Sequence, residues 1–416
     1  MEPRRKILHC DLNNFYASVE LQRHPEWKGK PLVVCGDKDA RHGIVLAKNA
    51  EAKACGVKTG EVLWEAVQKC GAELIQVPAD FAAYLNASKR VRKIYENYTD
   101  RVESFGIDEC WLDVTNSGIF GTAENIAYEI KERIKKEIGI TASVGVSWNK
   151  VFAKLGSDLK KPDAVTVITP QNYKKLVWER PVEELLYVGK QTKQKLHLMN
   201  VFTIGDLAQA PEGLLKEKLH VWGAYLKQFA NGEDNSPVTK IGEEENVKSI
   251  GNSMTNYKDM TTNDEIRALF YLLAESVSAR MREGGFSKAQ TVRISVRDNN
   301  LRTFGKQGKL KHPSRLTKDI AEFAFLLFRE VYDWHAPVRG LGVAVADFVF
   351  SNEQLDLFYD RETYEKTDRL EQTVAMIRKK YGKEIIQLGV IQKDEALKKA
   401  SVKEDPSISP DPFFHS

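Results

Sequence analysis

Residues 7–12 read Ile-Leu-His-Cys-Asp-Leu, a short apolar run broken by one acid. A run of this length and composition predicts a buried β-strand, and Asp11 stands at its end. Similar runs alternate with helical stretches, of which residues 81–98 and 122–138 are the clearest. The alternation predicts an α/β fold for residues 1–181. The other predicted strands are residues 32–35, 44–47, 74–77, 102–105, 110–114 and 142–146.

The rest of the chain divides into four parts by composition. Residues 182–233 have a helical pattern broken by glycines, which predicts a small helical module. Residues 234–247 are polar and contain three consecutive glutamates, a composition typical of a linker. Residues 248–350 follow the order strand, helix, strand, strand, helix, strand. Residues 351–416 are a polar tail with one amphipathic stretch.

The overall composition is that of a globular protein, with 42% hydrophobic and 29% charged residues and a net charge of +4. It excludes disordered and collagen-like chains. The longest mostly apolar run, residues 340–350, is shorter than the roughly 18 residues that predict a membrane span. Five cysteines without C-x-x-C spacing argue against a disulfide framework and against structural zinc. With no apolar signal segment at its start, we expect a cytoplasmic protein without a membrane partner.

Two acidic positions are candidates for chemistry: Asp11 at the end of the first strand, and the pair Asp108-Glu109 at the turn before a later strand. Acids at strand ends and turns can converge. Three carboxylates in one place repel each other and need cations between them, and hard oxygen ligands suit Mg²⁺. Two such ions are what phosphoryl transfer uses. Taken singly, however, each acid also fits an ordinary turn or cap residue.

One predicted strand of the last domain has a basic face. Arg293 and Arg297 alternate with apolar residues, and Arg302 follows in the next turn. Lysines continue the positive charge after Arg302, so the face is suited to contacts with nucleic-acid phosphates. An ordinary solvated sheet face is the alternative for these residues.

Several motifs occur in a fixed order along the chain. They are Asp-Leu-Asn-Asn-Phe-Tyr-Ala-Ser-Val-Glu at 11–20, Gly-Ile-Asp-Glu at 106–109, Asn-Lys-Val-Phe-Ala-Lys at 149–154 and Lys-Lys-Pro at 160–162. With them the chain resembles the Y-family lesion-bypass DNA polymerases, in the style of bacterial DNA polymerase IV, from Lys6 to about Phe358. The resemblance implies a right-hand fold with a catalytic palm and fingers at 1–181, a helical thumb at 182–233, a linker at 234–247, a β-α-β-β-α-β little finger at 248–350, and a tail at 351–416.

The resemblance also implies an active site. Asp11, Asp108 and Glu109 match the catalytic, metal-binding carboxylates, and the main-chain carbonyl of Leu12 joins them as a ligand. The cofactor implied is a pair of Mg²⁺ ions.

Four residues match the nucleotide-binding positions of the family. Phe15 and Tyr16 match the aromatic pair beneath the incoming nucleotide, where Tyr16 acts as a steric gate that excludes the ribose hydroxyl. Lys53 and Lys161 match residues that meet the triphosphate. The chain departs from the family at two of the neighbouring positions, because Ala50 stands where tyrosine is usual and Lys53 where arginine is usual. Lysine keeps the charge but loses the bidentate fork of arginine.

A short motif in the tail points to a protein partner. The pentapeptide Gln354-Leu355-Asp356-Leu357-Phe358 resembles the bacterial sliding-clamp-binding motif. Exposed Leu and Phe side chains in a polar context are suited to a partner's groove. Packing of these side chains against the little finger is the alternative.

Together these features predict a template-directed DNA polymerase that transfers nucleotides from dNTPs to a primer 3′-OH. The resemblance implies low-fidelity translesion synthesis in DNA repair, without a proofreading exonuclease, by a monomer that binds primer–template DNA, dNTPs and the sliding clamp. Two alternatives belong to other classes. A nucleotidyl cyclase shares the two-metal palm but needs neither a helical thumb nor a basic third domain. A catalytically inactive, clamp-docked DNA-binding accessory protein is favoured only where a carboxylate is missing.

Overall fold

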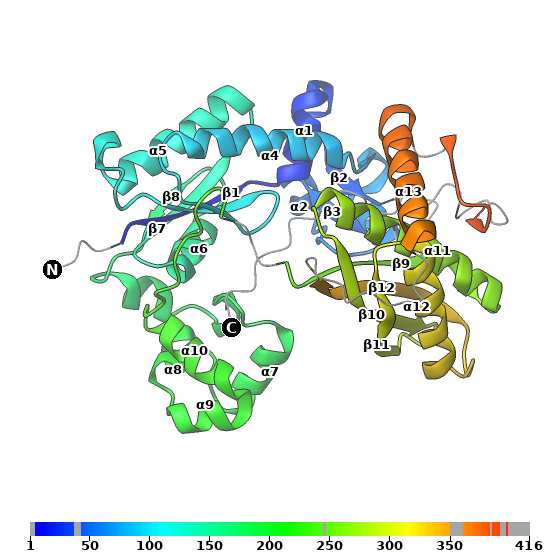
Figure 1. Ribbon diagram of the computed structural model, residues 1–416. Helices are drawn as coiled ribbons and strands as arrows, with labels where there is room; N and C mark the ends of the chain where they lie inside the picture. The colour runs from blue at the N-terminus through cyan, green and yellow to red at the C-terminus, as the bar shows by residue number, and fades with distance from the viewer. Residues whose placement is uncertain are drawn as a thin grey trace. The chain divides into compact units, whose positions relative to one another are not determined.

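The computed structural model describes residues 5–36, 43–243, 247–349, 361–382, 385–391 and 397. These residues form two compact units, which divide between residues 244 and 245 (Figure 1). Each unit has its own hydrophobic core. Within the described residues, no helix combines the length and the apolar composition that a membrane span requires. All five cysteines are free thiols.

The first unit is built on a five-stranded sheet of order β5-β6-β1-β7-β8. β1 lies in the centre because all six of its residues are buried, and it pairs antiparallel with β6 and β7. Apolar residues of one face pack against helices α4 and α5, while α6 covers the other face (Figure 1). The strands are β1 (Ile7–Leu12), β5 (Val102–Ser104), β6 (Glu109–Asp113), β7 (Ala142–Ser147) and β8 (Val165–Val167), and the helices are α4 (Phe81–Glu96), α5 (Ala123–Arg133) and α6 (Lys150–Leu159).

A smaller three-stranded sheet of order β3-β2-β4 carries two short helices in the same unit. Its core contains Val33, Val45, Ala52 and Ala66. Helix α1 connects the large sheet to it. The elements are α1 (Phe15–Arg23), β2 (Leu32–Cys35), β3 (Val45–Lys48), α2 (Ala50–Ala54), α3 (Leu63–Cys70) and β4 (Ile75–Pro78).

Four short helices follow the large sheet and share a core with α6, in which Phe152 and Leu155 meet Leu207 and Phe229. The helices are α7 (Lys190–Leu198), α8 (Ile204–Gln209), α9 (Glu212–Leu219) and α10 (Val221–Ala230).

The polar stretch after α10, whose composition predicted a linker, is attached to the first unit as far as residue 243. Val238 is buried, the backbone N–H of Thr239 donates to Glu103 Oε2 at 2.9 Å, and that of Lys150 donates to Asp234 Oδ2 at 3.0 Å. Its polar groups therefore have partners inside the protein, which composition alone does not reveal.

The second unit contains a four-stranded antiparallel sheet of order β11-β10-β12-β9, with α11 and α12 on one face. Its element order is the predicted β-α-β-β-α-β. β11 extends ten residues beyond the predicted strand at 301–304, and from Thr303 to Lys311 its residues alternate between exposed and less exposed positions. The elements are β9 (Ser249–Met260), α11 (Asn263–Glu283), β10 (Lys288–Asp298), β11 (Thr303–Ser314), α12 (Thr317–Val331) and β12 (Val338–Val349).

Helix α13 (Arg361–Tyr381) belongs to the second unit, where an ion-pair network holds it. Asp368 accepts hydrogen bonds from the guanidinium groups of Arg282 and Arg315, and Glu371 pairs with Arg282 at 2.6 Å. The tail predicted from residue 351 onward therefore contains a helix that packs on the preceding domain.

Candidate active site

The carboxylates predicted from the sequence converge at one end of β1. Asp11 lies directly opposite Glu109 in the β1–β6 register. Opposite residues of an antiparallel pair point to the same face of the sheet. Asp108 precedes β6, and its carbonyl accepts a hydrogen bond from the Leu12 N–H at 3.1 Å. The strand pairing therefore brings all three predicted acids and Leu12 together.

These carboxylates are poorly solvated. Burial raises the pKa of Asp11 to about 7 against the opposing charge of Lys161, and the charge of Glu109 adds to the increase. Burial also raises the pKa of Asp108, and Glu109 again contributes. Negative charge is thus concentrated where water is largely excluded, which favours a cation nearby.

Two lysines supply positive charge to this site. Lys154 of α6 forms an ion pair with Glu109 Oε2, and Lys161 Nζ lies 2.6 Å from Asp11 Oδ2 and 2.7 Å from Asp158 Oδ1. Lys161 was predicted to meet a triphosphate, whereas the structure places it on Asp11. Lys154 was not predicted as a site residue, although its spacing of three residues from Ser157 on α6 places both on one face of that helix.

The three acids are the kind of ligand that a divalent cation binds, although the carboxylates of Asp11 and Glu109 contact lysines in the structure. Among the residues that the structure describes, no three His, Cys, Asp or Glu side chains surround a common point. The donors available are hard oxygens, which Mg²⁺ prefers. The raised pKa values of Asp11 and Asp108 indicate buried negative charge that a cation would stabilise. This donor set therefore fits a divalent metal.

An aromatic cluster lies next to the carboxylates. Asn14 adopts a left-handed backbone conformation, with φ at 49°, so the chain reverses from β1 into α1. Phe15 is buried there, and the half-buried Tyr16 stacks on Tyr84 with ring centroids 4.4 Å apart. Burial raises the pKa of Tyr16, and the charge of Asp108 raises it further, which indicates that the phenol lies near the acids.

The two residues that depart from the family pattern, Ala50 and Lys53, lie on α2. Asn49 caps this helix by accepting a hydrogen bond from the Ala52 N–H at 3.0 Å. Ala50 and Lys53 are exposed on it. Among the described residues, none forms a hydrogen bond or ion pair with the Lys53 ammonium, so the structure does not bring Lys53 to the carboxylates.

Comparison with known proteins gives two family matches. Residues 10–158 match the impB/mucB/samB family, and residues 247–357 match the C-terminal domain of the same family. The chain belongs to the Y-family DNA polymerases. It is 51% identical to DNA polymerase IV of Acetivibrio thermocellus over 95% of this chain and 99% of the relative. It is also 38% identical to DNA polymerase IV 1 of Bacillus subtilis over 95% of each chain.

Solved structures agree with this assignment of the polymerase. A Y-family chimera of Dbh and Dpo4 matches with a TM-score of 0.73 at 27% identity, over 83% of this chain and 100% of the chimera. A Dbh ternary complex matches with a TM-score of 0.58 at 26% identity, over the same shares of the two chains. The polymerase is a DNA-directed, lesion-bypass enzyme with a separate C-terminal little finger. Neither the cyclase nor the inactive accessory protein is supported.

The predicted DNA-contacting arginines of the polymerase lie in the second unit. Arg293 and Arg297 are exposed on β10 and alternate with buried apolar residues, and Arg302 is exposed in the turn before β11. The Arg293 guanidinium donates to Gln307 Oε1 at 2.8 and 3.0 Å across the strand pair. The sheet face opposite the helices therefore carries positive charge.

The predicted clamp motif at 354–358 lies outside the described residues.

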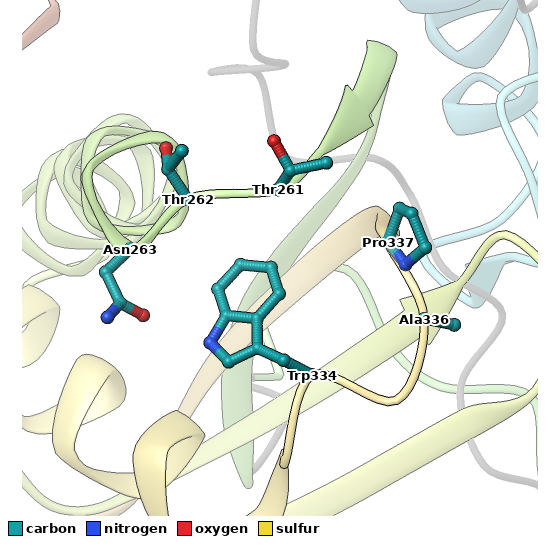
Figure 2. A pocket seen from close by; sticks show the side chains of 6 residues that line it. All are labelled: Thr261, Thr262, Asn263, Trp334, Ala336 and Pro337. Atoms are coloured by element: carbon teal, nitrogen blue, oxygen red, sulfur yellow. The ribbon is translucent and has the colours of Figure 1, made fainter.

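A cavity of about 400 Å³ opens in the second unit where the Trp334 ring lies between the start of α11 and Pro337 (Figure 2). None of the predicted site residues lines this cavity, so it is separate from the predicted site.

Proposed function

We propose that the polymerase transfers a nucleotide from a dNTP to the primer 3′-OH with two Mg²⁺ ions held by Asp11, Asp108, Glu109 and the Leu12 carbonyl. The observation that carries the proposal is the opposition of Asp11 and Glu109 across two buried strands. Bound divalent cations supply activation of the attacking hydroxyl and neutralisation of the leaving pyrophosphate. The chain's part is to hold these oxygens in a fixed, poorly solvated arrangement.

Lys161 connects this carboxylate site to the incoming nucleotide. Its ammonium lies 2.6 Å from Asp11 Oδ2. Phosphate oxygens are strong acceptors for an ammonium group. When the triphosphate and cations enter, we expect Lys161 to leave Asp11 and bind the phosphates, with Lys53 as a second contact from α2.

Tyr16 is proposed as the gate for the sugar, with Phe15 beneath it. Its ring is held by stacking on Tyr84, whose hydroxyl donates to the buried Glu20 carboxylate at 2.7 Å. We expect a ring fixed in this way to leave no space for a 2′-hydroxyl. Tyr16→Ala should therefore lower the ratio of dNTP to rNTP efficiency strongly, and an unchanged ratio would assign the exclusion to another residue.

The same proposal assigns roles to the modules. Residues 1–181 act as palm and fingers, residues 182–233 as the thumb, residues 234–247 as the connection and residues 248–350 as the little finger. In the last of these, Arg293, Arg297 and Arg302 contact DNA phosphates. The related Dbh forms a ternary complex, which supports the use of this fold to hold two substrates together.

We also propose that residues 354–358 bind a sliding clamp. Leu355, Leu357 and Phe358 are apolar anchors, and burying each in a groove contributes roughly 1.5 to 3 kcal/mol before ordering costs. Changing Leu357 and Phe358 to Ala should abolish synthesis stimulated by a loaded clamp and preserve the unstimulated rate. Leu326→Ala, which removes an exposed leucine of α12, is the matched control. Stimulation that persists in the double variant would refute the motif.

The central experiment is primer extension by Asp108→Asn and Glu109→Gln, measured over a range of Mg²⁺ concentrations. Each variant keeps the shape of the side chain and removes its charge. Incorporation should fall by a factor of at least about 1,000, equivalent to roughly 4 kcal/mol in the transition state, while primer–template affinity is kept. Glu124→Gln, an exposed acid of α5, is the control. Incorporation within tenfold of wild type in both variants would overturn the proposal.

A further inference from the structure

The carboxylate of Asp108 is held differently from the other two acids of the site. Lys161 pairs with Asp11, and Lys154 pairs with Glu109. Among the residues that the structure describes, no other side chain forms a hydrogen bond or ion pair with the Asp108 carboxylate. The direction of this side chain must therefore be set by the backbone that carries it.

Helix α6 supplies the partners of Glu109 because it lies close to the sheet. A Cβ atom at Gly145 of β7 would lie 1.8 Å from the Ala153 carbonyl oxygen, so only glycine lets the helix approach this far. The Ser157 hydroxyl of the same helix lies 2.9 Å from Nδ1 of the buried His9. The helix thus acts directly on strand residues, whereas Asp108 lies in the bend at 105–108 that precedes β6.

Two hydrogen bonds fix the peptide units on either side of Asp108. The carbonyl before it, that of Ile107, accepts from the Ser88 hydroxyl of α4 at 2.5 Å. The carbonyl of Asp108 itself accepts from the Leu12 N–H of β1 at 3.1 Å. Because a peptide unit is planar, fixing the units on both sides of a Cα atom fixes its two backbone dihedral angles. The direction in which the Asp108 side chain leaves the backbone is thereby set.

The rest of the bend is tied in the same way. Arg92 Nη2 of α4 donates to the Gly106 carbonyl at 3.3 Å. The Glu109 carbonyl accepts from the N–H groups of Phe105 and Gly106 at 3.0 and 3.3 Å. A Cβ atom at Gly106 would lie 3.3 Å from Oδ1 of Asp108, so the carboxylate lies directly against the bend. A displacement of the bend would therefore move the carboxylate with it.

The sequence of α4 places both donors on one face of the helix. Tyr84, Ser88 and Arg92 follow one another at intervals of four residues. A serine inside a helix commonly hydrogen-bonds the carbonyl four residues earlier. The buried Ser88 instead donates to a residue 19 positions away in the chain. Its hydroxyl therefore serves the bend rather than the helix, on the same face that carries the Tyr84 ring stacked on Tyr16.

We propose that Ser88 is a positioning residue for Asp108, with Arg92 as a second tie to the same bend. The hydroxyl holds the peptide unit that joins Ile107 to Asp108, and so keeps the carboxylate at the cation site. Without the hydroxyl, the Ile107 carbonyl loses its partner and this peptide unit can rotate. The inference rests on the proposed function, in which Asp108 is a metal ligand.

The test compares Ser88→Ala with Ser117→Ala. Both remove a buried serine hydroxyl that donates to a backbone carbonyl, and Ser117 bonds the Tyr98 carbonyl at 2.7 Å, beyond the end of β6 that lies away from Glu109. The readout is Mn²⁺ affinity, measured by electron paramagnetic resonance on the full chain with a dideoxy-terminated primer–template and the next dNTP. Ser88→Ala should weaken Mn²⁺ binding by about tenfold, and Ser117→Ala by less than about twofold. Ser88→Thr, which keeps the hydroxyl, should bind Mn²⁺ within about threefold of wild type.

Further measurements separate this inference from the proposed function. Both alanine variants should lower the thermal unfolding midpoint by similar amounts, so a loss of Mn²⁺ affinity in Ser88→Ala alone reports on the site rather than on stability. If Asp108→Asn loses Mn²⁺ while Ser88→Ala binds it like wild type, Ser88 has no positioning role. If Asp108→Asn also binds like wild type, the ligand assignment itself fails, and the inference fails with it.

A second variant covers the case in which Ser88→Ala does not fold. Arg92→Leu removes the tie to the Gly106 carbonyl, which lies two peptide units from the Asp108 Cα atom. Its expected loss of Mn²⁺ affinity is therefore smaller, about threefold. Wild-type affinity in Arg92→Leu would then refute the role of the bend.

Discussion

Two sheets of this polymerase carry ionisable residues on one face. In one sheet a helix covers these residues, and in the other they are exposed to solvent. In the first unit, His9, Asp11, Glu103 and Glu109 share a face that α6 covers, and each has a partner inside the protein. In the second unit, Arg293 and Arg297 stand on an open face, exposed to solvent. Covered charge is fixed in position and expensive to disturb, whereas open charge is mobile and adaptable. The first suits a reaction centre, and the second suits contacts with a polyanion of any sequence.

The contrast predicts the largest change in the free energy of unfolding for the buried ion pair of Glu103 and Lys150. The lysine ammonium contacts Glu103 and lies over the Trp111 ring at 4.5 Å. Glu103→Ala should lower the free energy of unfolding by about 3 to 5 kcal/mol, because the lysine charge is left buried without its carboxylate. Urea denaturation of the variant measures it. Arg293→Ala, which alters open charge, should change the same quantity by less than about 0.5 kcal/mol. An equal loss of unfolding free energy in the two variants would contradict the distinction between the covered and the exposed face.

A second prediction uses the titration of Asp11. Its pKa is about 7 in the folded protein and about 4 in an unfolded chain. The folded state therefore binds the extra proton between these values, and the metal-free protein loses stability as pH rises from about 4 to 7. Asp11→Asn should remove this loss and, at pH 8, raise the free energy of unfolding by on the order of 2 kcal/mol, with a smaller gain at pH 5, where only the first part of the loss has occurred. Thermal or urea unfolding without metal at both pH values tests it; a stabilisation that is the same at pH 5 would contradict the titration.

The smallest effect is expected on DNA binding by the exposed sheet face that carries Arg293 and Arg297. Changing Arg293 and Arg297 together to Ala should weaken primer–template binding several-fold and reduce the slope of log affinity against log salt by about 2, since two phosphate contacts are lost. Binding titrations at several salt concentrations measure the slope. Lys318 and Arg329, which are exposed on α12 of the helical side, give a double variant of equal charge. An equal change of slope in that control would show a general charge effect rather than a DNA-binding face.

The sequence could predict what depends on local pattern. The strand at 7–12 and the acids at its end follow from a short apolar run and its motif, and the order of elements in the second unit follows from the alternation of strand and helix patterns. β8 was not predicted, although β5, which is equally short, was. The attachment of residues 234–243 was missed because it depends on Glu103 and Lys150, which are distant in sequence.

In the candidate active site, too, only the residues that belong to local motifs could be predicted. The motifs named Asp11 and Glu109, and the strand register pairs them, whereas the role of Tyr16 stays a prediction. His9, Lys154 and Ser157 were not predicted as site residues, because their meeting requires α6 to lie across the sheet. That placement is a property of tertiary packing, and no local pattern contains it.

The close contact between Gly145 and α6 also has a consequence for how the polymerase can vary. At this position the Ala153 carbonyl would lie 1.8 Å from any Cβ atom, so even alanine must push the helix outward. Such a shift would carry Lys154 and Ser157 away from Glu109 and His9 together. In a saturation library selected for primer extension, position 145 should tolerate no substitution, although its residue has no side chain and takes no part in the chemistry. The absence of a Cβ atom at position 145 thus sets the distance between the sheet that carries Asp11 and Glu109 and the helix that carries Lys154 and Ser157.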